Sequence, residues 1–176
     1  MNKQELIEKL NQKHNLFIEL LSSFSEKEFE MSYNGKWTAG QQLQHLLLSI
    51  KPISSALLIP RLLIKILFGK ANRPGKTYQE IADKYQAMLN EGAKAKGAYI
   101  PKAVKFKQKG EIIQPLEKTL YKLSKQLYTF TENELDSIIL PHPIMGKITV
   151  REMIYFTIYH VELHTEITKR NLNLDL

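Results

Sequence analysis

His160 and His164 stand four residues apart in an amphipathic stretch near the end of the chain. A separation of four places both side chains on one face of an α-helix, where the two imidazoles can bind the same cation. A third histidine, His45, stands in an earlier stretch of helical pattern. Three neutral imidazoles that leave coordination positions open are typical of a catalytic metal site, because structural zinc is usually closed by four protein ligands. His45, His160 and His164 are therefore the candidate metal ligands.

The surroundings of the pair favour an inward orientation. The residues that share its face are mostly apolar: Met153, Phe156, Thr157, Leu163 and Ile167. A buried neutral imidazole needs a hydrogen-bond partner or a cation. The simpler alternative is that each ring donates to a nearby carbonyl, and for a single histidine it would be preferred. Two rings on one inward face, with a third from another helix, favour the metal.

Other residues near these patterns have structural interpretations. We expect His14 to be a structural histidine of the first helix that could border the same cavity, and His142 to brace a loop through local backbone bonds. Trp37 should pack as a hydrophobic anchor before the second helix, with a place in the pocket wall as the alternative. Tyr155 and Tyr159 lie opposite the histidine pair, so their face should meet solvent or a dimer partner.

The composition predicts a single domain over residues 1–176. The chain is 43% hydrophobic and 24% charged, which is ordinary for a globular protein, and it contains no cysteine. Any metal must then rely on nitrogen and oxygen ligands. The N-terminal segment lacks the apolar core of a signal peptide, so we expect a cytoplasmic protein. Leu43 to Phe68 is strongly apolar, but charged residues and prolines interrupt it, which favours a buried or amphipathic helix over a membrane span.

Apolar residues recur at helical spacing in several segments, and no run of strict alternation stands out, so the fold class should be all-α. The first helix carries a stripe from Leu6 to Phe24. The second begins at a capping box of Thr38 and Gln41 and should end at about Ser49, before Pro52.

The third long helix should span Ile113 to Phe130, and the last should run from a second capping box at Thr149 and Glu152 to about Arg170. These four helices predict a four-helix bundle with an insertion between the second and third. The two prolines of Pro141 to Gly146 predict a tight loop before the last helix.

The insertion should hold an apolar segment, Ile53 to Phe68, and a short amphipathic helix from Tyr78 to about Leu89. Residues 93–110 then carry six lysines and no acid. We expect a solvated, mobile connection, because charged runs usually have that role. Contact with a phosphate or an acidic substrate is the alternative.

Several motifs together resemble the DinB/YfiT-like superfamily of bacterial four-helix-bundle proteins. They are, in order, Trp37-Thr38, His45-Leu46, His142-Pro143 to Gly146, Thr149 to Glu152, and His160 with His164. The resemblance covers nearly the whole chain. It implies that His45, His160 and His164 bind one divalent metal ion, with zinc or nickel preferred and iron or manganese as alternatives. Members of the family often place a glutamine three residues after the last histidine, where this chain has Ile167, so a polar contact to a ligand is either missing or supplied from elsewhere.

The resemblance also implies an activity. Related proteins include transferases and isomerases that use low-molecular-weight thiols, and a divalent cation lowers the pKa of a thiol that binds it. Thiol transfer to a small-molecule substrate is thus the first hypothesis, and hydrolysis with the same ligands stays open.

A second hypothesis is a non-catalytic interaction protein that forms a homodimer. Nucleic-acid binding through the lysines ranks last because no helix carries a basic stripe, and we expect no membrane partner.

Other chemistries find no support in the sequence. It contains neither a phosphate-binding GxxxxGK[ST] loop nor a GxSxG elbow, and it offers no thiol nucleophile. The ExxH pattern of di-iron bundles is missing as well, because Gln42, Thr157 and Val161 stand three residues before the candidate ligands. A site with one metal ion fits better.

Overall fold

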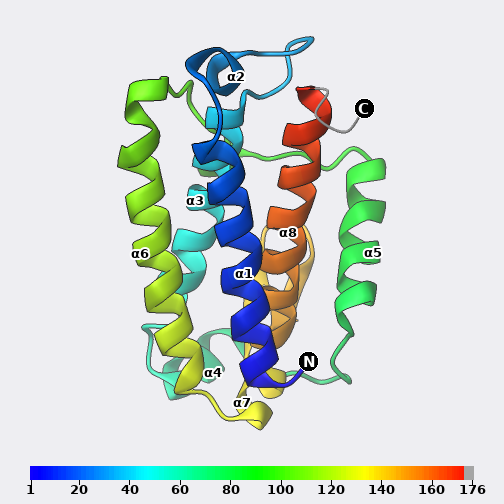
Figure 1. Cartoon of the computed structure of the whole chain (residues 1–176). Helices are drawn as coiled ribbons and strands as arrows, with labels where there is room; N and C mark the ends of the chain where they lie inside the picture. The colour runs from blue at the N-terminus through cyan, green and yellow to red at the C-terminus, as the bar shows by residue number, and fades with distance from the viewer. Residues whose placement is uncertain (173–176) are drawn as a thin grey trace.

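The computed structural model of the chain describes residues 1–172. Four long helices lie side by side as a bundle, in agreement with the predicted fold class (Figure 1). They are α1 (Lys3–Ser22), α3 (Ala39–Ala56), α6 (Lys109–Tyr128) and α8 (Val150–Asn171). The insertion contributes α4 (Arg61–Phe68) and α5 (Tyr78–Asn90), and α5 lies against the outer side of α8.

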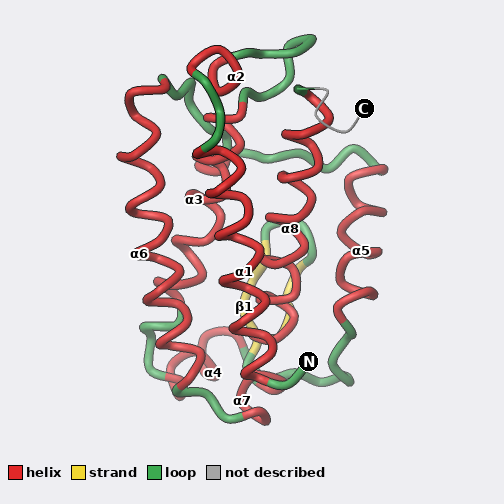
Figure 2. The backbone as a smooth tube through the Cα atoms, in the orientation of Figure 1, coloured by secondary structure: helices red, strands yellow, loops and turns green. Residues whose placement is uncertain are grey.

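The remaining elements are short and join the long helices (Figure 2). They are α2 (Glu26–Glu30), the 3₁₀ turns at Gly97–Tyr99 and Phe106–Gln108, α7 (Glu132–Ser137), β1 (Ile139–His142) and β2 (Gly146–Thr149). The core between the long helices is aliphatic and aromatic, and the predicted stripe of α1 from Leu6 to Leu21 is fully buried in it.

Both predicted capping boxes are present and fix where the histidine-bearing helices begin. At the start of α3, the amide of Gln41 donates to Thr38 Oγ1 at 3.1 Å, and the amide of Thr38 donates to Gln41 Oε1 at 3.0 Å. At the start of α8, Glu152 and Thr149 bond in the same reciprocal way. These bonds satisfy amides that would otherwise lack partners in the first helical turn.

The predicted end of the second long helix was wrong. Helix α3 continues past Ser49 and through Pro52 to Ala56. A proline inside a helix removes one backbone hydrogen bond, here to the carbonyl of Leu48, and costs about 3 kcal/mol. Pro52 is exposed, so water can reach that carbonyl, while Ile53 and Leu57 beyond it are buried in the core. Their burial favours continuing the helix.

The segment predicted as a tight loop forms most of a β-hairpin. Strands β1 and β2 pair antiparallel, with Pro141 opposite Lys147 and His142 opposite Gly146. A two-stranded sheet has only edge strands, where proline is tolerated. Gly146 has a φ of 75°, a left-handed conformation that favours glycine. His142 braces this turn as predicted, because its Nδ1 accepts hydrogen bonds from the amides of Ile144 and Met145.

The face of α8 that carries Tyr155 and Tyr159 was predicted to meet solvent or a dimer partner, and this was wrong. Helix α5 covers it. Tyr155 is buried and meets the edge of the Tyr78 ring, Tyr159 donates to Gln86, and the Tyr78 hydroxyl donates to Glu162. The insertion thus packs as a fifth helix against α8.

Within residues 1–172, no single helix is long and apolar enough to cross a membrane. Helices α3 and α4 reach that length and composition only when they are taken together, and they are bent by 106° at the break between them.

Gly40 marks a close approach between α3 and the segments that cover its first turn. A Cβ atom at this position would lie 2.7 Å from Phe29 Cε1 and 3.0 Å from Val104 Cβ. We expect Gly40→Ala to lower the free energy of unfolding by about 1–3 kcal/mol, because the packed neighbours must shift. Urea denaturation measures this, with Gly110→Ala as the control because no atom lies within 4 Å of a Cβ there. Equal effects of the two changes would contradict the expectation.

Candidate metal centre

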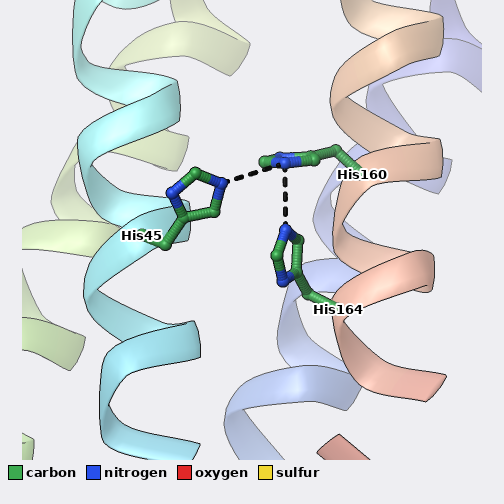
Figure 3. A group of neighbouring side chains, drawn as sticks. All are labelled: His45, His160 and His164. Atoms are coloured by element: carbon green, nitrogen blue, oxygen red, sulfur yellow. Dashed lines mark hydrogen bonds between the residues drawn. The ribbon is translucent and has the colours of Figure 1, made fainter. Parts of the chain in front are cut away.

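The structure brings the three predicted ligands together between α3 and α8 (Figure 3). His160 Nε2 lies 3.2 Å from His45 Nε2 and 3.0 Å from His164 Nε2. Helix α8 presents His160 and His164 one turn apart, and α3 presents His45 from across the bundle. Three nitrogens bound to one zinc ion at about 2.0–2.1 Å in tetrahedral geometry would be about 3.3 Å apart. The two distances from His160 match this value, and all three ligand atoms lie within 4.8 Å of one another, so the cluster could hold a single ion.

All three rings are buried. Burial disfavours the imidazolium form and lowers the pKa of His45, and it lowers the pKa of His160 well below its ordinary range, with His164 and His45 adding to the effect. For His164, burial lowers the pKa to about 3. The rings are thus neutral at pH 7 and need not lose a proton to bind a cation.

Two of the rings are held by hydrogen bonds from the nitrogen that points away from the cluster. His45 Nδ1 donates to the carbonyl of Tyr99 at 2.7 Å, and His164 Nδ1 donates to Gln42 Oε1. A neutral imidazole carries one proton, so these bonds leave both Nε2 atoms as lone pairs that face the cluster. Outer contacts of this kind orient the histidine ligands of metal sites.

The donor set fits a cation better than it fits an empty cluster. His160 Nε2 lies between the two lone pairs, and a neutral His160 can donate one hydrogen bond there at most. The Nε2 lone pair of the remaining ring would then lie about 3 Å from His160 Nε2 without receiving a hydrogen bond, which is unfavourable in a buried site. A divalent ion among the three Nε2 atoms satisfies all of them. Imidazole nitrogen suits zinc, nickel, iron and copper.

Three contributors to the site were missed or misassigned from the sequence. Gln42 supplies the polar contact that Ile167 cannot, and it is buried one turn before His45 on the same face of α3. Its spacing of three residues from His45 was the available signal. Trp37 was expected to be an anchor, with a place in the pocket wall as the alternative, and it lies beside the ligands, with ring centroids 4.9 Å from His45 and 6.4 Å from His164. The Tyr99 carbonyl is a backbone group, which no residue pattern reveals.

The lysine-rich connection therefore takes part in the site. It was predicted to be solvated and mobile, and most of its lysines are exposed, but it is anchored to the bundle. Besides the Tyr99 contact, Val104 is buried, and Phe106 packs edge-on against Phe29 with centroids 5.8 Å apart. Lys105 pairs with Glu30 at 2.9 Å. These contacts hold the segment across the first turns of α3.

The other two histidines lie outside the cluster. His14 is fully buried, and its Nδ1 donates to the carbonyl of Leu10 at 2.8 Å, as expected of a structural histidine. Its ring borders a cavity of about 10 Å³ that His160 and Thr157 also line, which approaches the space needed by one water. The His142 ring lies 4.3 Å from that of Phe156.

The fold and the site define a class: a helical bundle in which two helices share three inward histidines that could hold one metal ion. The chain belongs to the DinB superfamily, whose family model matches residues 9–168. This agrees with the resemblance seen in the sequence. Comparisons with curated proteins and with solved structures give no match.

Gln42 offers a test of the outer contacts. We expect Gln42→Leu to weaken zinc binding by about 10- to 100-fold, because it removes the acceptor that orients His164 and leaves a buried N–H without a partner. Competition titration against a zinc-binding dye measures the change. Gln126→Leu is the matched control, since Gln126 also bonds across the bundle, but to Ser54 and not to a ligand ring. Unchanged affinity in Gln42→Leu would exclude the orienting role.

Proposed function

We propose that the chain is a metal-dependent transferase that binds one divalent ion through His45, His160 and His164 and uses a low-molecular-weight thiol as its nucleophile. The bound ion would supply one effect, a lower pKa for a thiol that occupies its open coordination position. Membership of the DinB superfamily supports this type of chemistry.

The observation that carries the proposal is the composition of the ligand set. Within residues 1–172, the cluster that could hold a metal contains three histidines and no carboxylate. A set of three neutral protein ligands leaves a position for an exogenous group, as in catalytic sites. Because the ligands carry no charge, the ion keeps its full positive charge toward that group.

Aromatic rings lie beside the three histidines and could contact an organic substrate. Trp37 is half-buried beside His45 and His164, so it can contact both the ligands and a molecule that enters from solvent. Tyr85 and Phe156 pack against His160 on the other side, with centroids 5.9 and 4.9 Å away. Burial raises the pKa of Tyr85 to about 12, so its hydroxyl stays protonated and neutral at pH 7.

The test is a screen of zinc-loaded and nickel-loaded protein against several biological thiols paired with electrophiles. We expect the protein to consume a thiol and to form a thioether, and mass spectrometry can detect both changes. Neither change should occur with His160→Ala. The control is His142→Gln, which removes a histidine outside the cluster. Ester or amide hydrolysis that needs the three histidines but no thiol would instead assign a hydrolase.

A further inference from the structure

Helix α4 exposes an unusually apolar surface. Ile64 is fully buried, but Leu58 just before the helix and Leu62 and Ile66 within it are 74%, 72% and 70% exposed. Together with Leu63 and Leu67, which are 45% and 59% exposed, they make up what we call the α4 apolar face. Single exposed leucines are ordinary, but a contiguous group of large aliphatic side chains usually marks an interaction surface.

The chain segment that contains this face is rich in basic residues. Residues 31–79 contain seven lysines and arginines and no aspartate or glutamate. Lys65 lies on α4 itself, and Lys70 follows the helix and is exposed. The acidic residues of α7 lie at the same end of the bundle, but Glu134 pairs with Arg61, and Glu132 and Asp136 pair with Arg151. Glu134 also attracts Lys65, so the positive charge beside the apolar face lies mainly at the exposed Lys70 and in the region that follows α4.

A basic cleft adjoins the end of α4. It has a volume of about 380 Å³, and Phe68, Lys70, Arg73 and Lys147 are among the residues that line it. Lys147 Nζ donates to the carbonyl of Phe68, and Arg73 pairs with the buried Glu152, so both side chains are fixed at the cleft. A cleft of this size, lined by lysine and arginine side chains, is suited to bind a phosphate group.

We propose that the α4 apolar face and the adjoining cleft bind the surface of an anionic phospholipid bilayer. Short amphipathic helices lie in the plane of such an interface with aliphatic side chains in the acyl boundary and basic residues at the phosphates. A second copy of this chain on the same face would bring two basic clefts together, so charge complementarity favours the lipid. This differs from the expectation of no membrane partner, and it does not depend on the proposed activity.

The location of α4 is compatible with an open metal centre. Helix α4 lies at the end of the bundle where α7 is found, whereas His45 lies near the start of α3, toward the end that carries α2 (Figure 1). A bilayer at the α4 end would leave Trp37 and the lysine-rich connection facing solvent.

The test is flotation of the full chain with phosphatidylcholine vesicles that contain or lack phosphatidylglycerol. We expect binding to the anionic vesicles only, weakened by added salt. The double variant Leu62→Gln with Ile66→Gln should lower the partition coefficient about tenfold or more, because it removes the aliphatic groups that enter the bilayer. Lys65→Gln and Lys70→Gln should each lower it about fivefold. Leu16→Gln, at an exposed leucine of α1, is the matched control.

Three outcomes would overturn the proposal. The first is no flotation of the unmodified protein with anionic vesicles at low salt. The second is flotation that the double variant leaves unchanged while circular dichroism shows that it is folded. The third is a dimer, seen by sedimentation velocity, that the double variant dissociates, since this would assign the α4 apolar face to a second copy of the chain.

Discussion

Protein carrying His160→Ala should be purified with almost no bound metal, whereas the unmodified chain should hold about one divalent ion. His160 Nε2 lies within 3.2 Å of the Nε2 atoms of both other ligands, so its loss leaves two nitrogens on different helices. The loss of affinity should exceed the roughly 10- to 100-fold expected for removing an outer contact such as Gln42. Elemental analysis of protein prepared without chelator gives the metal content, and dye competition gives the affinity.

The control for this experiment is a variant of a histidine that lies outside the cluster. His142→Gln removes an imidazole that bonds only to its own loop, so we expect the metal content to stay near one ion per chain. Full metal retention in His160→Ala would show that any bound ion lies elsewhere. A bound ligand stabilises the native state by mass action, so removing the metal by chelation should also lower the melting temperature of the unmodified chain but not that of His160→Ala.

The parts of the site that could be predicted from the sequence are those with a local signal. The capping boxes fix the first turns of α3 and α8, and the HxxxH spacing fixes that two rings share a face. The contact of Gln42 with His164 joins residues 122 positions apart, and the Tyr99 carbonyl reaches His45 from the insertion. Such contacts depend on how the helices pack against one another, and this packing cannot be predicted from a single sequence.

The wrong predictions about the fold have a common physical cause. Local propensity placed a helix end before Pro52 and a loop at Pro141, but burial of Ile53 and Leu57 favours a longer helix, and an edge strand tolerates Pro141. The tyrosine face of α8 looked exposed because its partner, α5, comes from the insertion rather than from the four long helices. Tertiary packing outweighed local propensity in each case.

Acid should destabilise the metal-free protein between pH 6.5 and pH 4 through its buried histidines. Burial lowers the pKa of His14 to about 4, and burial with the nearby charge of Lys84 lowers the pKa of His142 to about 4. In the unfolded chain these groups have a pKa near 6.5. Between the two values the unfolded state binds protons that the native state does not, so the free energy of unfolding falls as the pH falls.

The size of this effect follows from the shifts. Each of the two histidines contributes about 3 kcal/mol to the free energy of unfolding. This contribution is fully present above pH 6.5 and is lost by pH 4. The buried ligand histidines act in the same direction when no metal is bound, because burial lowers their pKa values too. Urea denaturation at several pH values, with a chelator present, measures the slope.

A variant separates the titration of His14 from a general loss of packing. His14→Gln keeps a side chain that can donate to the Leu10 carbonyl but cannot gain a proton, so the pH slope should become shallower by up to about 1.4 kcal/mol per pH unit. Tyr85→Phe alters a buried ring that does not titrate in this range, so it should change the stability at every pH and leave the slope alone. If His14→Gln kept the full slope, as Tyr85→Phe should, the acid sensitivity would have to come from groups other than His14. The buried ligand histidines would then be the next residues to replace.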